Sequence, residues 1–203
     1  MAGTGSRSRR TRAITLATAG LATALALGCA RRGTGVSEAA LAGQPTGMLP
    51  AGRVYVMEMS GIPAGDTTVT FMAGQARTIL LQHGSPDHTV FAEVAFPPGS
   101  FPGADDSVTV TLRPRPGVYG LELAMPRPPG PGATIRFRYP MHLAPPRAAE
   151  VHYGPRARLE SALVIGRVLE DGRIGLLASS RPASDNLQAP LVGAGSYLLI
   201  APR

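Results

Sequence analysis

From Arg53 to the end of the chain, apolar and polar residues alternate with a period of two in many short runs. In the run Val90–Phe96, apolar residues occupy every second position and Glu93 falls on the other face. Successive side chains of a β-strand point to opposite faces, so this pattern predicts strands with one buried and one solvated face. The same alternation recurs at residues 68–71, 107–113, 119–125 and 134–139.

Turn-forming residues separate these runs. Pro97–Gly99 is one such break, and Asp171–Gly172 between two apolar runs is the strongest hairpin signal. All 20 prolines lie at Pro45 or later, and proline is excluded from helix interiors. Residues 53–203 are therefore predicted to form an all-β domain, a two-sheet antiparallel Ig-like sandwich of about nine or ten strands. Only Arg147–Val151 has a helical composition, and we expect it to be too short to matter.

The N-terminal segment has a different pattern. Four arginines within the first 12 residues precede an uncharged run, residues 13–28, and Cys29 follows that run. A basic start, a short apolar run and small residues at its end are typical of an export signal. The run has 16 residues, fewer than the roughly 20 needed to span a bilayer. Residues 1–28 are predicted to be a signal peptide.

The residues around Cys29 carry a family resemblance. Leu25-Ala26-Leu27-Gly28-Cys29 resembles the lipobox of bacterial lipoproteins, although Ala26 stands where that family prefers leucine. The resemblance implies that the Cys29 thiol receives fatty acids such as palmitate and that the signal is cut before it. Several acyl chains would hold the protein firmly on a membrane. An ordinary secretory signal with a coincidental cysteine is the alternative.

The resemblance also implies a location, the cell envelope outside the cytoplasm. Ala30 is not the aspartate associated with inner-membrane retention, which indicates the outer membrane if the source is a two-membrane bacterium. Ser8-Arg9-Arg10 is similar to a twin-arginine export signal, so two export routes stay open. Residues 29–52 show no sustained period and are predicted to be a lipidated flexible tether.

Composition narrows the function classes. Without residues 1–28 the chain has 16 arginines against 13 acidic residues, a net charge of only +3. That charge, export and the lack of a recognised motif argue against nucleic-acid binding. Cys29 is the only cysteine, so the exported domain has no internal disulfide and depends on its hydrophobic core.

From about residue 76 the order of features resembles ZU-type domains, the β-sandwich modules of zonula occludens proteins, netrin receptors and ankyrins. Thr89–Phe101 is similar to their entry strand and turn, Ile135–Pro140 to a middle strand, and Ser196–Ile200 to the final strand. The resemblance covers residues 76–203. The chain lacks the family's late tryptophan, and it has Gly193–Gly195 where a histidine and a phenylalanine are usual. The resemblance implies a structural or interaction module.

The densest polar cluster is the turn His83–His88. His83, Asp87 and His88 could hold a metal ion, because imidazole and carboxylate groups are zinc ligands. A turn rich in Gly, Ser and Pro also gathers polar residues for backbone reasons, which is the alternative. His142 and His152 are too isolated in the sequence to complete a site. A metal-dependent enzyme using this turn is a remote alternative function.

Charge is unevenly distributed along the chain. Residues 36–106 carry a net charge of −5 and residues 113–158 a net charge of +6. If Arg113, Arg136 and Arg138 share a solvent face, that face would attract an anionic polymer or lipid head group. The alternative, which we expect, is that neighbouring acidic and basic strands neutralise each other in one sheet.

Taken together, these patterns predict a non-enzymatic lipoprotein of the cell envelope that presents a β-sandwich for structural or protein-interaction roles. The expected partners are the membrane, through the lipid anchor, and an unidentified envelope protein or anionic polymer. No cofactor is expected. A module that binds a lipid, an anionic polymer or a small apolar ligand is the alternative function.

Overall fold

A computed structural model describes residues 44–139 and 141–203. The predicted signal peptide, the lipidation site Cys29 and most of the predicted tether lie outside the described residues. The described chain contains 14 strands, two α-helices and one 3-10 turn, η1 (Ala51–Arg53). None of its helices is long and apolar enough to cross a membrane.

The strands are distributed along the whole described chain. In order they are β1 (Gly47–Leu49), β2 (Val54–Val56), β3 (Glu58–Met59), β4 (Thr67–Met72), β5 (Arg77–Gln82), β6 (Val90–Phe96), β7 (Ser107–Pro114), β8 (Gly120–Ala124), β9 (Thr134–Arg138), β10 (Leu143–Ala144), β11 (Val164–Val168), β12 (Ile174–Leu176), β13 (Asn186–Pro190) and β14 (Gly195–Pro202). Helices α2 (Arg147–Tyr153) and α3 (Arg156–Ala162) lie between β10 and β11.

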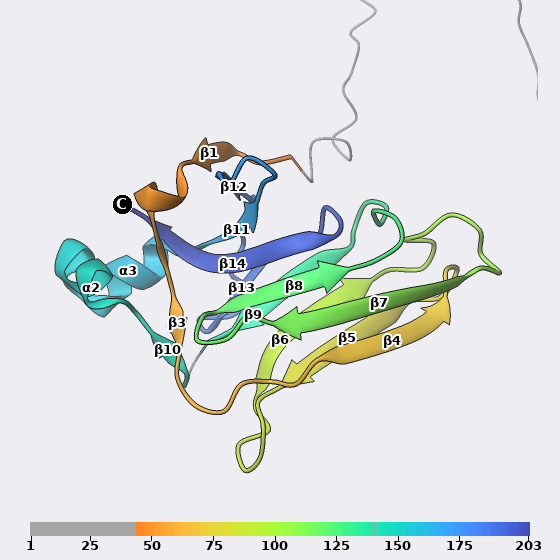
Figure 1. Ribbon diagram of the computed structural model, residues 1–203, viewed down its shortest axis with the longest axis horizontal. Helices are drawn as coiled ribbons and strands as arrows, with labels where there is room; N and C mark the ends of the chain where they lie inside the picture. The colour runs from red at the N-terminus through yellow and green to blue at the C-terminus, as the bar shows by residue number, and fades with distance from the viewer. Residues whose placement is uncertain (1–43, 140) are drawn as a thin grey trace, which may run out of the picture. The chain divides into compact units, whose positions relative to one another are not determined.

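The strands form two main antiparallel sheets. The first sheet has the order β1-β12-β11-β14-β8-β7-β4, with β2 beside β14, and the second has the order β13-β9-β6-β5. A two-stranded ribbon of β3 and β10 adds to one end. In Figure 1 the first sheet lies in front of the second, with the two helices together at one end. The predicted all-β antiparallel sandwich is confirmed.

Alternation along the strands builds the core between the sheets. In β9, Ile135 and Phe137 are fully buried while the flanking arginines are partly exposed, as the period of two predicts. Phe91 and Phe137 of the second sheet meet Tyr119, which directly precedes β8 of the first, with ring centroids 5.4–6.4 Å apart. Such aromatic pairs contribute roughly 0.5–1.5 kcal/mol each beyond their buried area.

The number of strands exceeds the nine or ten predicted. The difference comes from strands of two or three residues, such as β1, β3, β10 and β12, which are too short to show a period in the sequence. One of these short strands, β1, lies within residues 29–52, the predicted tether. β1 pairs with β12, and the Thr46 amide donates to the Leu176 carbonyl at 2.7 Å. Residues 46–52 therefore belong to the domain and cover an edge that β12 would otherwise expose.

The stretch Arg147–Val151 is more helical than expected. It opens a pair of seven-residue helices, α2 and α3, each preceded by a proline. Gly154 ends α2 with a positive φ of 69°, a conformation that glycine adopts at little cost. Ala149 and Leu159 bury one side of the pair against the sandwich.

Candidate functional site

The loop between β5 and β6, residues 83–89, is held by its own hydrogen bonds. The His83 amide donates to the Thr89 carbonyl at 2.9 Å, which closes the loop at its base. The Asp87 amide donates to the Gly84 carbonyl at 3.2 Å. The Thr89 hydroxyl donates to Asp87 Oδ2 at 2.8 Å. These contacts fix the position of the Asp87 carboxylate.

His142 reaches this loop from the connection between β9 and β10. Its Nε2 is hydrogen-bonded to Asp87 Oδ2. Its carbonyl accepts hydrogen bonds from the Ser60 amide at 2.9 Å and the Ser60 hydroxyl at 3.3 Å. The ring lies so close to Gly61 that a Cβ there would be 2.8 Å from His142 Nδ1. Glycine at position 61 therefore makes room for the imidazole.

His83 is the buried member of the group, with only 2% of its surface exposed. Its Nδ1 lies 3.0 Å from the Ile62 carbonyl oxygen, which only accepts hydrogen bonds. Nδ1 must therefore carry a proton, and in the neutral ring Nε2 has a free lone pair. The His83 and His142 rings lie 4.2 Å apart between centroids.

The three side chains converge on one point. One ligand atom each from His83, Asp87 and His142 lies within 4.8 Å of the others. The Thr89 hydroxyl, with smaller contributions from His142 and His83, lowers the pKa of Asp87 below its ordinary value, although partial burial opposes this. The carboxylate is thus held in its charged form beside two imidazoles, a donor set suited to a metal ion.

The predicted metal set needs one correction. His83 and Asp87 belong to the cluster, but His88 does not: it is exposed, at a positive φ of 55°, and His142 takes its place. Neighbouring residues in a turn direct their side chains differently, so sequence adjacency to Asp87 gives His88 no place in the group. His142 was missed because 55 residues separate it from Asp87.

A buried tyrosine hydroxyl lies in the same part of the core. The Tyr119 hydroxyl has no hydrogen-bond partner among the described residues. Burial, and to a smaller extent the Asp87 carboxylate, raises the pKa of Tyr119 above its ordinary value.

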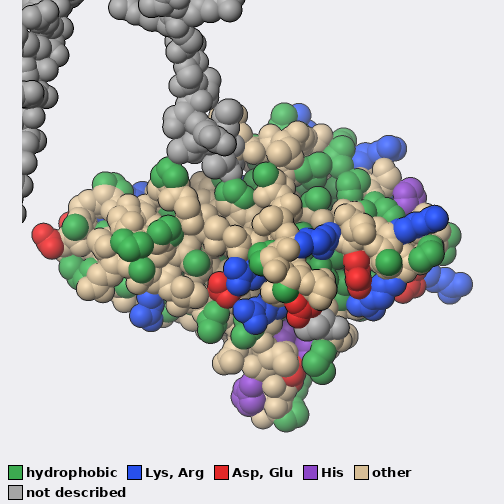
Figure 2. Space-filling view, turned by 180° about the vertical axis from the view of Figure 1, so that it is seen from behind, with side chains coloured by type: hydrophobic (Ala, Val, Ile, Leu, Met, Phe, Trp, Pro, Cys, Tyr) green, Lys and Arg blue, Asp and Glu red, His purple; other side chains and the backbone are tan. Residues whose placement is uncertain are grey.

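The three predicted anion-binding arginines do not share a face. Arg113 lies on β7 of the first sheet, whereas Arg136 and Arg138 lie on β9 of the second. Arg113 pairs with Asp66 at 3.4 Å. Figure 2 views the molecule from behind and shows arginine and acidic side chains close together there.

The two arginines of β9 also form ion pairs within the domain. Arg136 and Arg138 both pair with Glu93 of the neighbouring strand β6, at 3.3 and 3.6 Å. Arg136 also donates to Gln188 of β13 at 3.0 Å. For these residues, the charges on neighbouring strands neutralise each other, as we expected.

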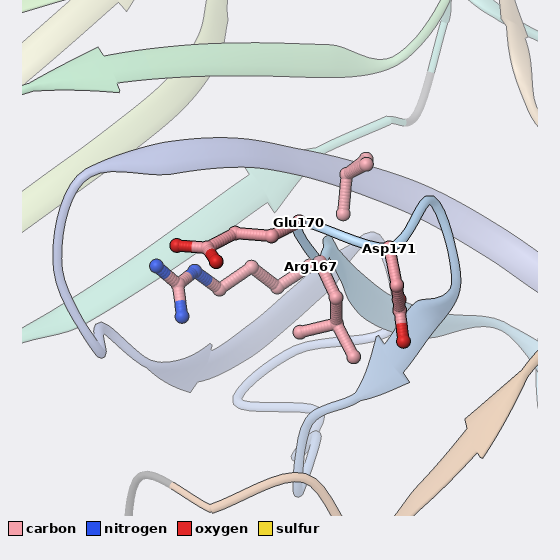
Figure 3. A pocket seen from close by; sticks show the side chains of 5 residues that line it. Arg167, Glu170 and Asp171 are labelled. Carbon is pink, nitrogen blue, oxygen red and sulfur yellow. The ribbon is translucent and has the colours of Figure 1, made fainter.

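A separate hollow of about 420 Å³ lies at the β11–β12 hairpin, lined by Arg167, Val168, Leu169, Glu170 and Asp171. In Figure 3 the Arg167 guanidinium and the Glu170 carboxylate point to one side, and Asp171 points to the other. Arg167 donates to the Ala194 carbonyl at 2.7 Å, and Asp171 pairs with Arg173 at 2.6 Å. These charges are of both signs and largely engaged within the chain, so the hollow indicates no ligand class.

Comparisons with protein-family models, with curated proteins and with solved structures found no match. The resemblances to bacterial lipoproteins and to ZU-type domains therefore depend on the residues alone.

Proposed function

We propose that the protein is a lipid-anchored component of the cell envelope whose β-sandwich acts by binding, without catalysing a reaction. The observation that carries the proposal is the position of Cys29. The only cysteine of the chain directly follows Gly28, at the end of an apolar run behind an arginine-rich start. A thiol in that position is the expected acceptor of lipid, and two or more acyl chains give stable anchoring.

The described fold supports a role in contact with a partner. The first described strand, β1, and the β5–β6 loop lie at opposite sides of the domain (Figure 1). In this proposal the chain is anchored upstream of β1, so the anchor uses no residue of the loop side. Ile62 and Met141, which adjoin the His83–Asp87–His142 cluster, are 51% and 68% exposed. In this proposal the two exposed apolar side chains are part of the surface that contacts the partner.

The anchor is tested by expressing the full chain in a bacterium supplied with labelled palmitate. We expect the wild-type chain to take up the label, to lose residues 1–28 and to sediment with membranes. The Cys29→Ser variant should remain unlabelled and uncut. Thr23→Ser, a conservative change inside the apolar run, is the matched control and should behave as wild type.

Two results would contradict the anchor. One is a wild-type chain that takes up no palmitate although it is exported. The other is a Cys29→Ser chain that is cut and held on membranes like the wild type. Either result leaves the structure of residues 44–203 and any site within it unaffected.

A further inference from the structure

We propose that His83, Asp87 and His142 bind one divalent transition-metal ion, with zinc as the expected occupant. The site goes beyond the proposed function, because it requires neither the lipid anchor nor a partner. Its ligands come from two segments far apart in the chain, and their ligand atoms already lie within 4.8 Å of one another.

His83 and Asp87 each have a free donor atom whose position is set by the residue's other contacts. The Ile62 carbonyl accepts a hydrogen bond from His83 Nδ1, so Nε2 is the free nitrogen. Metal-bound histidines commonly donate their other ring N–H to a backbone carbonyl in this way. Thr89 and His142 both contact Oδ2 of Asp87, which leaves Oδ1 without a hydrogen-bond partner among the described residues.

Binding requires only a small rearrangement. In a tetrahedral zinc site with ligand distances near 2.0–2.1 Å, the donor atoms lie about 3.3 Å apart. Donor separations of up to 4.8 Å must therefore shrink by up to about 1.5 Å, and His142 Nε2 must exchange its hydrogen bond with Asp87 for a bond to the metal. The ion then takes the position between the two groups. A neutral His142 ring binds through Nε2 as the tautomer that carries its proton on Nδ1, whereas a doubly protonated ring releases one proton to solvent.

The donor set distinguishes between classes of metal ion. Two imidazole nitrogens and one carboxylate suit zinc, copper, nickel or cobalt, whereas calcium and magnesium prefer oxygen ligands throughout. The ligands can come from distant parts of the sequence because the β5–β6 loop and the β9–β10 connection meet at one end of the sandwich. Figure 2 shows histidine side chains on the projection formed by the β5–β6 loop.

A bound ion would connect three segments at this end. These are the β5–β6 loop, the connection that holds His142, and the segment after β3, where Gly61 packs on His142 and Ile62 contacts His83. Three protein ligands leave one tetrahedral position for water or a partner's side chain. The competing interpretation is a plain hydrogen bond between Asp87 and His142 that holds the loops without an ion.

The test uses the full chain, purified in detergent without a histidine tag and stripped of metal. Zinc binding is measured by equilibrium dialysis with elemental analysis, and cobalt is used to report coordination through its visible absorption. We expect one zinc ion per chain and a rise in melting temperature on binding. Magnesium and calcium should not compete at similar concentrations.

Three variants remove a ligand while keeping the local hydrogen bonds. His83→Asn retains a donor for the Ile62 carbonyl, His142→Gln retains a donor for Asp87, and Asp87→Asn retains an acceptor. Each should weaken zinc binding by more than about tenfold, since loss of even an outer partner of a metal site costs roughly 10–100-fold. His88→Asn is the matched control, because asparagine tolerates the positive φ, and it should bind zinc as wild type does.

The proposal is overturned if the wild-type chain binds no stoichiometric zinc, or if His88→Asn weakens binding as much as His142→Gln. X-ray absorption of the zinc-loaded wild type requires no variant and covers the case in which a variant does not fold. It should show imidazole and oxygen ligands with two imidazoles per zinc. One imidazole or none would also overturn the site.

Discussion

The guanidinium of Arg181 donates a hydrogen bond to the hydroxyl of Tyr139 at 2.7 Å, across 42 residues of sequence. The same guanidinium donates to the carbonyls of Glu160 and Leu163, at the end of α3. Tyr139 follows β9 and is 2% exposed, so one side chain connects the helical pair to the second sheet. Burial raises the pKa of Tyr139, and Arg181 opposes that rise.

Replacing Arg181 with methionine is therefore expected to destabilise the domain. The change removes three hydrogen bonds from a charged donor and leaves the Tyr139 hydroxyl buried without that partner, at a cost of about 1.5–3 kcal/mol. Urea unfolding measures the change. Arg158→Met, at an exposed position of α3, is the control and should stay within about 0.5 kcal/mol of wild type. An Arg181→Met variant as stable as that control would show that the connection is unimportant.

The helical pair shows where the sequence stops being informative about the fold. The long strands were predictable, because β6, β7 and β9 bury alternate positions against a shared core. The helices were underestimated because each has only seven residues and owes its stability to packing. Pro146 and Pro155 before the helices and Gly154 between them were usable signals of helix starts and an end.

The candidate site was predictable in part for a similar reason. His83 and Asp87 lie in one loop, so their grouping could be read from the sequence. His142 joins them only because β6 and β9 are neighbours in the second sheet, and the chain after β9 returns past the loop after β5. The alternation of apolar and polar residues within one strand does not reveal which distant strand lies beside it in the sheet. The two arginines of β9 meet Glu93 through the same pairing.

Four tyrosines should make the domain sensitive to alkali. Burial raises the pKa values of Tyr119, Tyr139, Tyr153 and Tyr197 above the ordinary value of 10.0. A raised folded-state pKa contributes stability that is complete below the unfolded value and is lost as pH rises through the folded value. The free energy of unfolding should therefore fall above about pH 10. The chain has no tryptophan, so the phenolate absorbance reports this ionisation directly.

Two single variants separate burial from hydrogen bonding in this effect. The Tyr197 hydroxyl donates to the Gly193 carbonyl at 2.7 Å, so Tyr197→Phe should cost about 1 kcal/mol at neutral pH. The Tyr119 hydroxyl has no partner among the described residues, so Tyr119→Phe should be neutral or stabilising. Both variants should lose less stability in alkali than wild type. Phenolate absorbance that rises fully near pH 10 without unfolding would contradict the prediction.

The boundary of the domain is tested by hydrogen exchange on the intact chain. The Thr46 amide is bonded to Leu176, and β1 pairs with β12, so a peptide covering residues 46–50 should exchange slowly. The exposed turn at Ser184 provides the fast reference. If residues 46–50 exchange as fast as that turn, the tether extends to residue 52, as the sequence alone suggested.

Glu93 should control whether the second sheet attracts anions. Its carboxylate is 16% exposed and is shared by Arg136 and Arg138. Glu93→Gln leaves those two cations unpaired side by side on β9, so we expect a loss of about 1 kcal/mol in stability. The same variant should gain salt-dependent retention on heparin, because the freed arginines then act together on a polyanion.

Glu150→Gln changes the net charge by the same amount at an exposed position of α2 and is the matched control. If heparin retention depends on net charge alone, the two variants will elute at the same salt concentration. Later elution of Glu93→Gln alone would show that the wild-type ion pairs keep this face from binding anionic polymers. Strong retention of the wild-type chain on heparin would instead support binding of an anionic polymer by Arg136 and Arg138.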